Sequence, residues 1–281
     1  MPIELYRRRR PLREPRQLAL ALAVTLVSMA LVTAAPRSAA DEPRSSATPL
    51  APSAAVKAAP APADAASHKV RAGNLVGHGG PVKAIAVDQG SARALTGCFD
   101  YAMMVWDLSG DEPRLLHRLA EHDGAVNAVA FLPGGRRALA AGDDGRIAVW
   151  DLEAGRLVGR LEGHTAKIVG LAVSPAGRSA ASASWDRTAR QWDLERLAAG
   201  PVIEGHAGPV NAVAFSADGT RLYTAGYDGA VNLHAVADGA LLRPVHKHGW
   251  GINVLARLPG AEQLVLGALN GSAKVVDGAT G

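Results

Sequence analysis

The sequence predicts an all-β fold in which one antiparallel sheet unit is repeated along the chain. From about residue 70 to residue 281, short apolar runs are separated by clusters of glycine, proline, aspartate and serine, which is typical of short strands joined by turns. Five histidines recur at a nearly constant interval of about 42 residues, which predicts a repeat architecture. An aspartate or asparagine follows each histidine at one fixed separation. The paired positions are His78 and Asp100, His122 and Asp144, His164 and Asp186, His206 and Asp228, and His248 and Asn270.

The repeated unit is clearest between residues 163 and 193. A Gly-His pair opens it, a Trp-Asp pair closes it, and strands are expected at 168–173 and 179–184, with a further strand ending at Trp192. The preceding unit has the same pattern, with strands expected at 126–131, 137–141, 147–150 and 157–161. Four short strands per unit, apolar on both faces and rich in alanine, valine and glycine, favour sheets that stack radially and bury each other's faces.

A period in the low forties with Gly-His and Trp-Asp at its ends resembles the WD40 repeat over about residues 70–281. The resemblance implies a β-propeller with five recognisable repeats, at about residues 78–121, 122–163, 164–205, 206–247 and 248–281. Two arrangements are open. Either residues 70–76 return as the outer strand of the fifth repeat and close a five-bladed ring, or the chain forms an incomplete part of a seven-bladed propeller.

The amino-terminal segment, residues 1–40, has the pattern of an export signal. Six arginines between Arg7 and Arg16 precede an uncharged run at 17–35, and small residues follow at 38–40, which predicts a signal peptide cleaved after Ala40. An uncleaved membrane anchor is the alternative, because about 20 apolar residues suffice to span a bilayer. Residues 41–69 are mostly alanine, proline and serine, a composition that predicts a disordered linker. The protein is therefore expected to be exported, to the periplasm or as a membrane-anchored form.

Charge and cysteine content exclude several classes of function. Residues 1–40 have a net charge of +5, so residues 41–281 have a net charge of about −1, given the total of +4. The concentrated basic surface of a nucleic-acid-binding protein is therefore not expected. Cys98 is the single cysteine, so no intramolecular disulfide, zinc–cysteine cluster or covalently attached haem is expected within these residues. The His246-x-His248 pair has no visible third ligand. The sequence therefore predicts no metal and no cofactor.

The recurring polar residues have two interpretations. His164, Ser182 and Asp186 superficially resemble a hydrolase triad, but a nucleophile is needed once per active site and this set recurs. The family resemblance instead implies a structural network, in which a tryptophan N–H reaches a hydroxyl that meets the histidine, which meets the aspartate. Ala140, His234 and the fifth repeat depart from this pattern. The network positions are His78, Thr96, Asp100, Trp106, His122, Asp144, Trp150, His164, Ser182, Asp186, Trp192, His206, Thr224 and Asp228.

A candidate binding surface is predicted where large apolar residues occupy turns that normally favour small polar ones. In WD40 propellers, which these repeats resemble, the loop that begins each repeat and the turn before the structural aspartate lie on one face of the propeller. This face is expected to bind a protein or peptide partner, although packing of the same rings over neighbouring blades is an equal alternative. Its candidate residues are Phe99, Trp185, Tyr227, Leu269, Trp250, Lys83, Lys167, Asn127 and Asn211.

Two functions remain open from the sequence. The first is a non-catalytic exported scaffold that binds its partner through the aromatic-rich face. The second is the propeller portion of a periplasmic electron-transfer or sensory protein, because the chain resembles exported bacterial WD40 proteins, some of which carry a C-terminal c-type cytochrome domain. A c-type cytochrome is therefore one expected partner, and neither function requires an enzymatic activity of this chain.

Overall fold

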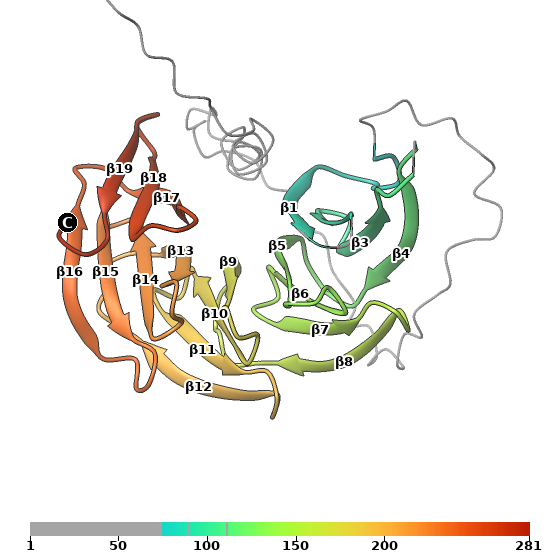
Figure 1. The fold of residues 1–281 in the computed structure, drawn as a ribbon, viewed down its shortest axis with the longest axis horizontal. Coiled ribbons are helices and arrows are strands. Elements are labelled where there is room, and N and C mark those ends of the chain that lie inside the picture. The colour runs from blue at the N-terminus through green and yellow to red at the C-terminus, as the bar shows by residue number, and fades with distance from the viewer. Residues whose placement is uncertain (1–74, 89, 91, 111) are drawn as a thin grey trace, which may run out of the picture.

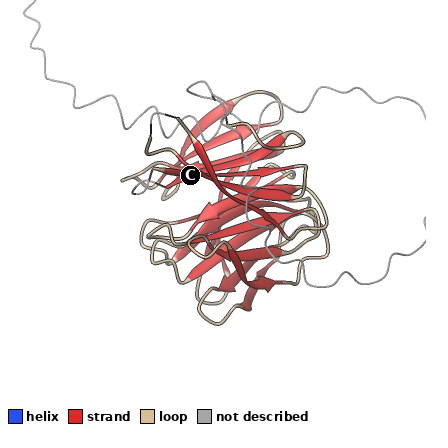
Figure 2. Cartoon of the chain, turned by 90° about the vertical axis from the view of Figure 1, so that its right-hand side faces the viewer, coloured by secondary structure: helices blue, strands red, loops and turns tan. Residues whose placement is uncertain are grey.

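The computed structural model describes residues 75–281 apart from 89, 91 and 111. In this part of the chain, nineteen strands form five antiparallel sheets, and no element is a helix (Figures 1 and 2). The all-β prediction is confirmed. The expected signal segment at 1–40, the linker at 41–69 and residues 70–74 lie outside the described residues. Within those residues, no helix is present that could cross a membrane.

Each sheet is a meander of strands that are consecutive in the sequence. Sheet 1 contains β1 (Val82–Asp88), β2 (Arg93–Cys98), β3 (Ala102–Asp107) and β4 (Arg114–Ala120). Sheet 2 contains β5 (Val126–Phe131), β6 (Arg137–Gly142), β7 (Ile147–Asp151) and β8 (Arg156–Leu161). Sheet 3 contains β9 (Ile168–Val173), β10 (Ser179–Ser184), β11 (Ala189–Asp193) and β12 (Ala198–Ile203). Sheet 4 contains β13 (Val210–Phe215), β14 (Arg221–Gly226), β15 (Ala230–Ala235) and β16 (Leu241–Lys247). Sheet 5 contains β17 (Ile252–Arg257), β18 (Gln263–Ala268) and β19 (Ala273–Asp277).

The core is divided among the junctions between successive sheets. One apolar cluster joins sheets 1 and 2, where Leu95 and Val105 are buried with Val126 and Trp150, and similar clusters fill the next three junctions. Small residues allow the sheets to approach closely. A Cβ atom on Gly97 would lie 2.7 Å from a methyl group of Val126, so this junction requires glycine. Burial of apolar faces between sheets, repeated four times, is what holds the repeats together.

The five sheets form an open arc with their first strands on the inside (Figure 1). Figure 1 shows a space between sheet 5 and sheet 1. Val275 on β19 is 62% exposed, whereas Val105 and Val149 at the corresponding positions are fully buried beneath the next sheet. At the start of the described chain, Leu75 packs on Met104 and Trp106 of sheet 1, so it does not add a strand to sheet 5. A closed five-bladed ring is therefore not what the described residues form.

Candidate functional site

In sheets 1 to 4, the histidine that precedes the sheet is held to it by hydrogen bonds between side chains. In sheet 3, His164 Nδ1 lies 2.6 Å from Asp186 Oδ2 and His164 Nε2 lies 2.7 Å from Ser182 Oγ, while Trp192 Nε1 donates to Ser182 Oγ at 2.8 Å. Because the Asp186 carboxylate can only accept, Nδ1 of His164 carries the hydrogen and donates to it. Nε2 of the neutral ring then accepts from the Ser182 hydroxyl, whose oxygen accepts from the indole. The backbone N–H of Thr165 also donates to Asp186. The set therefore ties the entering loop to the turn between β10 and β11.

Sheet 1 repeats these contacts with a threonine in place of serine. His78 contacts Asp100 Oδ2 at 3.0 Å and Thr96 Oγ1 at 2.7 Å, and Trp106 Nε1 donates to Thr96 at 2.8 Å. Burial alone would raise the pKa of Asp100, but hydrogen bonds from the Gly79 N–H and the His78 ring outweigh it and hold the pKa at about 2. The carboxylate is therefore ionised across the physiological range.

Sheet 4 keeps the network although it lacks the tryptophan. His206 contacts Asp228 at 3.0 Å and Thr224 at 2.8 Å. His234 takes the place of the indole, and its Nε2 lies 3.2 Å from Thr224 Oγ1. The substitution retains the contact to the hydroxyl, but no group in the described part of the chain meets hydrogen-bond geometry with the buried Nδ1 of His234. Burial lowers the pKa of His234 to about 4, so this ring is neutral at pH 7.

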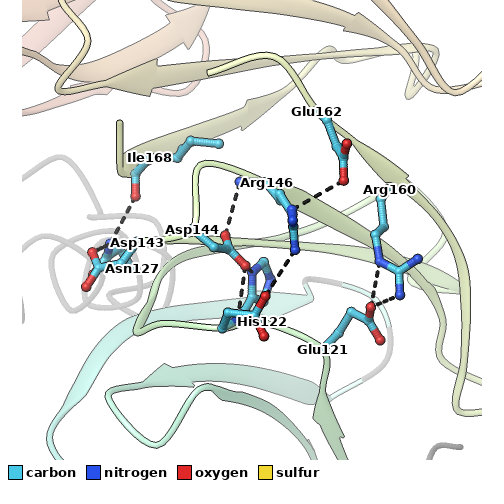
Figure 3. Close-up of polar contacts among 10 residues, drawn as sticks. Glu121, His122, Asn127, Asp143, Asp144, Arg146, Arg160, Glu162 and Ile168 are labelled. Carbon is cyan, nitrogen blue, oxygen red and sulfur yellow. Dashed lines mark hydrogen bonds and ion pairs between the residues drawn. The ribbon is translucent and has the colours of Figure 1, made fainter. Parts of the chain in front are cut away.

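Sheet 2 has lost the hydroxyl at the centre of the network. His122 Nδ1 still contacts Asp144 Oδ2 at 2.9 Å (Figure 3). With Ala140 at the position of Ser182, both His122 Nε2 and Trp150 Nε1 are buried without a hydrogen-bond partner among the described residues. In sheets 1 and 3, a hydroxyl group bonds to both equivalent nitrogens. Sheet 2 lacks this hydroxyl and therefore has two buried nitrogens whose hydrogen bonds are not formed.

Sheet 5 uses its histidine differently. The backbone N–H of Trp250 donates to His248 Nδ1 at 3.1 Å, and Asn270 accepts from Ser272 instead. His248 therefore closes a local turn that presents Trp250, which is 61% exposed. The departures of Leu266, Asn270 and Val276 from the repeat pattern coincide with this change.

The hydrolase interpretation fails on access. Ser182 has no exposed surface, and its hydroxyl is already shared between Trp192 and His164. Burial lowers the pKa of His164 even though the Asp186 carboxylate opposes the shift. The triad-like residues form a closed internal network that a substrate cannot reach.

Cys98 lies beside the network of sheet 1. Its Sγ donates to the Gly80 carbonyl at 3.1 Å and accepts from the Asp100 N–H at 3.4 Å, as the Ser184 hydroxyl does with Ala166 and Asp186 in sheet 3. Potential ligand atoms of His78, Cys98 and Asp100 lie within 4.8 Å of one another, but these contacts already use them. Burial raises the pKa of the Cys98 thiol. The thiol therefore acts as a buried structural group in place of a serine.

Exposed aromatic side chains lie at the turns that precede the network aspartates. Trp185 and Tyr227, from sheets 3 and 4, are each 42% exposed, and their rings meet edge to face with centroids 6.1 Å apart. Phe99 is similarly exposed at the same turn of sheet 1. Aromatic residues that stay exposed in adjacent turns are typical of recognition surfaces.

Two lysines lie beside these rings. Lys167 Nζ is 3.5 Å from the centre of the Trp185 ring, and Lys83 Nζ is 5.2 Å from the centre of the Phe99 ring, both within the range of a cation–π interaction. Both lysines also line a central cavity of about 780 Å³ together with the first strands of all five sheets. Trp185, Tyr227 and Leu269 lie on the same cavity. The structure thus brings together predicted candidates from all five sheets, since Asn127 and Asn211 also line the cavity, whereas Phe99 and Trp250 are not among its lining residues.

Asn127 and Asn211 join neighbouring sheets. The side-chain amide of Asn127 donates to the Ile168 carbonyl at 3.1 Å and to Asp143 at 2.7 Å (Figure 3). Asn211 donates to the Ile252 carbonyl at 2.9 Å and is only 6% exposed. Each amide therefore forms a hydrogen bond with the first strand of the next sheet. Asn127 and Asn211 were predicted only as partner contacts, so this structural role was not predicted. Figure 3 also shows the ion pairs that Arg146 forms with Glu162 and Arg160 forms with Glu121.

Two features of this face were missed from the sequence. Tyr101 and Arg187 follow the network aspartates at positions where sheets 2 and 4 have Gly145 and Gly229, and both have positive φ angles, of 66° and 72°. Tyr101 is half exposed. Comparing the residue after each network aspartate would have revealed the two non-glycine positions.

Replacing Arg187 with glycine is expected to raise the free energy of unfolding by about 1 kcal/mol, because a left-handed conformation costs a non-glycine residue about 1–2 kcal/mol and the added chain entropy of glycine offsets part of the gain. Urea unfolding of the purified chain measures this. The reverse change, Gly145→Arg, should destabilise, since a Cβ atom there would lie 3.0 Å from the His164 carbonyl oxygen at a φ of 73°. A loss of stability in R187G would show that the arginine side chain contributes more than the backbone strain costs.

Comparison with known families locates the repeats independently of the geometry. The family model described as "WD domain, G-beta repeat" matches residues 69–107, 113–151, 155–193 and 200–234, together more than half of the chain. Sheet 5 lies outside these matches, in keeping with its altered histidine contacts. A comparison with curated proteins found no match.

Proposed function

This chain belongs to the WD40 family, and we propose that it is an exported, non-catalytic scaffold that binds a protein or peptide partner through the aromatic-rich face of its sheets. Proteins with WD40 repeats generally act as β-propeller interaction scaffolds and generally perform no chemistry themselves. The fold thus supports binding as the class of function, while the particular face is argued from its side chains.

One observation carries the proposal. Large apolar side chains are exposed at adjacent turns around the central cavity, where the chain makes no use of them for its core. Trp185, Tyr227 and Trp250 are each more than 40% exposed, although the packing between sheets is completed by other residues. A cluster of exposed aromatic side chains lowers solubility, and a bound partner would remove these side chains from water.

Export is proposed from residues 1–40 alone. Their arginine-rich start, uncharged run and small residues before Asp41 have the order of a signal peptide. An exported scaffold with one buried cysteine needs no disulfide, because each junction between sheets already buries an apolar cluster. Amino-terminal sequencing of the protein recovered from the periplasm would test cleavage after Ala40, and an intact amino terminus in the membrane fraction would favour an anchor.

The variants Trp185→Ala and Trp250→Ala are each expected to reduce capture of the partner at least tenfold, because a buried aromatic side chain at the centre of an interface commonly contributes about 2 kcal/mol. The partner is first identified by affinity capture from a periplasmic extract with the unaltered chain, and its binding is then measured with purified components. Recovery of a c-type cytochrome would favour the electron-transfer alternative for the partner.

Matched controls come from the outer strands. Val202 on β12 and Leu241 on β16 have comparable exposed fractions but lie away from the cavity, so V202A and L241A should bind as the unaltered chain does. Equal binding by all four variants would contradict the proposed face while leaving the WD40 fold untouched.

A further inference from the structure

The central cavity has a charge pattern that the proposed function does not explain by itself. Of the residues that line it, the charged ones are Lys83 and Lys167, and no aspartate or glutamate is among them. Within the described residues, neither lysine forms an ion pair with a carboxylate. The exposed acid at the equivalent turn of sheet 2, Asp143, lies outside the lining and accepts a hydrogen bond from Asn127. The cavity therefore contains two positive charges that the described part of the chain leaves without a counter-charge.

Both lysines are held in place by rings. Lys167 Nζ lies 3.5 Å from the centre of the Trp185 ring, and Lys83 Nζ lies 5.2 Å from the centre of the Phe99 ring. Each ammonium group therefore contacts a ring on one side and can bind a ligand on the other. A cation–π contact does not neutralise the charge and leaves ammonium N–H donors free for a ligand. Because the side chains are already oriented, less conformational entropy is lost when an anion binds.

An apolar surface continues from Lys167 toward sheet 5. Trp185 meets Tyr227 edge to face, and the backbone at Gly251 approaches both Tyr227 and Leu269 so closely that a Cβ atom would lie within 3 Å of each. Trp250 precedes this glycine and is the most exposed aromatic residue of the face. A ligand that reaches the lysines from this side therefore passes over indole and phenol rings.

We propose that this face recognises an acidic peptide segment, with aspartate or glutamate side chains placed at Lys167 and Lys83 and a neighbouring large apolar side chain placed on Trp185 and Tyr227. The inference rests on the proposed function and specifies the chemistry of the partner. A peptide is favoured over a nucleic acid because two lysines neutralise too few phosphates for strong binding. Besides the lysines, the lining consists of asparagine amides, aliphatic side chains and the rings of Trp185 and Tyr227. A basic peptide would place a third cation beside two that have no counter-charge.

The test is selection from a random peptide library displayed with a blocked carboxyl terminus, using the purified full chain as bait. We expect enrichment of aspartate or glutamate one to three positions from a leucine or aromatic residue. The best peptide, synthesised with an amidated end, should lose about tenfold in affinity when its acidic residue is changed to the amide, the usual size of a charge-assisted hydrogen bond. Lys167→Met should cause a similar loss, because methionine keeps the apolar stem over Trp185 but removes the charge.

Lys274→Met is the matched control, since Lys274 is exposed on β19 and does not line the cavity. Its affinity for the peptide should be unchanged, and thermal unfolding of each variant verifies that it is folded. Enrichment of apolar peptides without acids, abolished by Trp185→Ala, would overturn the acidic preference and leave the proposed function standing. If the Trp185→Ala and Trp250→Ala chains enrich the same peptides as the unaltered chain, both the acidic preference and the proposed binding face would be overturned. Enrichment of basic peptides, or tighter binding of a single-stranded DNA oligonucleotide than of any peptide, would also overturn the inference.

Discussion

The Ser182→Ala variant is expected to lose about 2–5 kcal/mol of unfolding free energy, because removing its hydroxyl leaves two buried nitrogens without partners and each unsatisfied group costs about 1–3 kcal/mol. The Ser182 hydroxyl accepts from Trp192 at 2.8 Å and contacts His164 at 2.7 Å, and the side chain is fully buried. The effect is therefore one of the largest expected for a single atom of this chain. Equilibrium unfolding in urea, with an unchanged slope against denaturant, measures the loss.

The chain offers its own reverse experiment. In sheet 2, Ala140 stands at the position of Ser182, and His122 Nε2 and Trp150 Nε1 are both unpaired among the described residues. Ala140→Ser should therefore raise the unfolding free energy by about 1–3 kcal/mol, since one added hydroxyl can satisfy both nitrogens. If S182A and A140S both change stability by less than the error of the measurement, the network contributes no net stability. If A140S destabilises, the alanine site is too tightly packed for the added oxygen.

The period of the repeat was sufficient to predict the sheets because it reflects local chemistry. Alternating short apolar runs and turn residues specify strands such as β9 and β10, whose ends match the expected 168–173 and 179–184. The hydroxyl, histidine and indole groups meet because they occupy fixed places in each meander. Their contacts in sheet 3 are the ones that the resemblance to WD40 repeats implies, because one repeat alone also fits a hydrolase triad.

What the sequence did not reveal depends on contacts between repeats. Asn127 and Asn211 contact carbonyls 41 residues later, and no pattern within one unit distinguishes such a contact from an exposed amide at the binding face. The local turn of His248 with Trp250 arises because the fifth repeat lacks the aspartate. Whether five sheets close or remain open depends on the angle between neighbouring blades, which no single side chain encodes.

Acidification is expected to destabilise the fold in two separate pH windows, because two kinds of buried group have lowered pKa values. A histidine whose folded pKa lies below its unfolded value of 6.5 is neutral in the fold, so protons favour the unfolded chain as the pH falls. His234 is 1% exposed and burial lowers its pKa to about 4, so its contribution, about 3 kcal/mol, is present above pH 6.5 and lost between pH 6.5 and 4.

The carboxylates act at lower pH. Burial opposes the shift, but hydrogen bonds from Gly79 and His78 lower the pKa of Asp100 from 3.8 to about 2. The stability that this carboxylate contributes is therefore complete above pH 3.8 and is lost as the pH falls toward 2. The two windows thus adjoin near pH 4 without overlapping appreciably, which allows separate variants to reduce the pH dependence in each one.

His234→Phe tests the upper window, since phenylalanine keeps a planar ring, although a larger one, and has no titrating group. The variant should be less stable at pH 7, where Thr224 loses one contact, yet its stability should fall less steeply between pH 6.5 and 4 than that of the unaltered chain. Part of the slope will remain, because burial also lowers the pKa values of His164 and His246. Asp100→Asn is the control, because it should reduce the slope only below pH 3.8, where Asp218 and other carboxylates with lowered pKa values keep the rest of it. Chemical unfolding at half-unit steps of pH separates the two, and identical slopes for H234F and the unaltered chain between pH 6.5 and 4 would show that His234 does not govern the upper window.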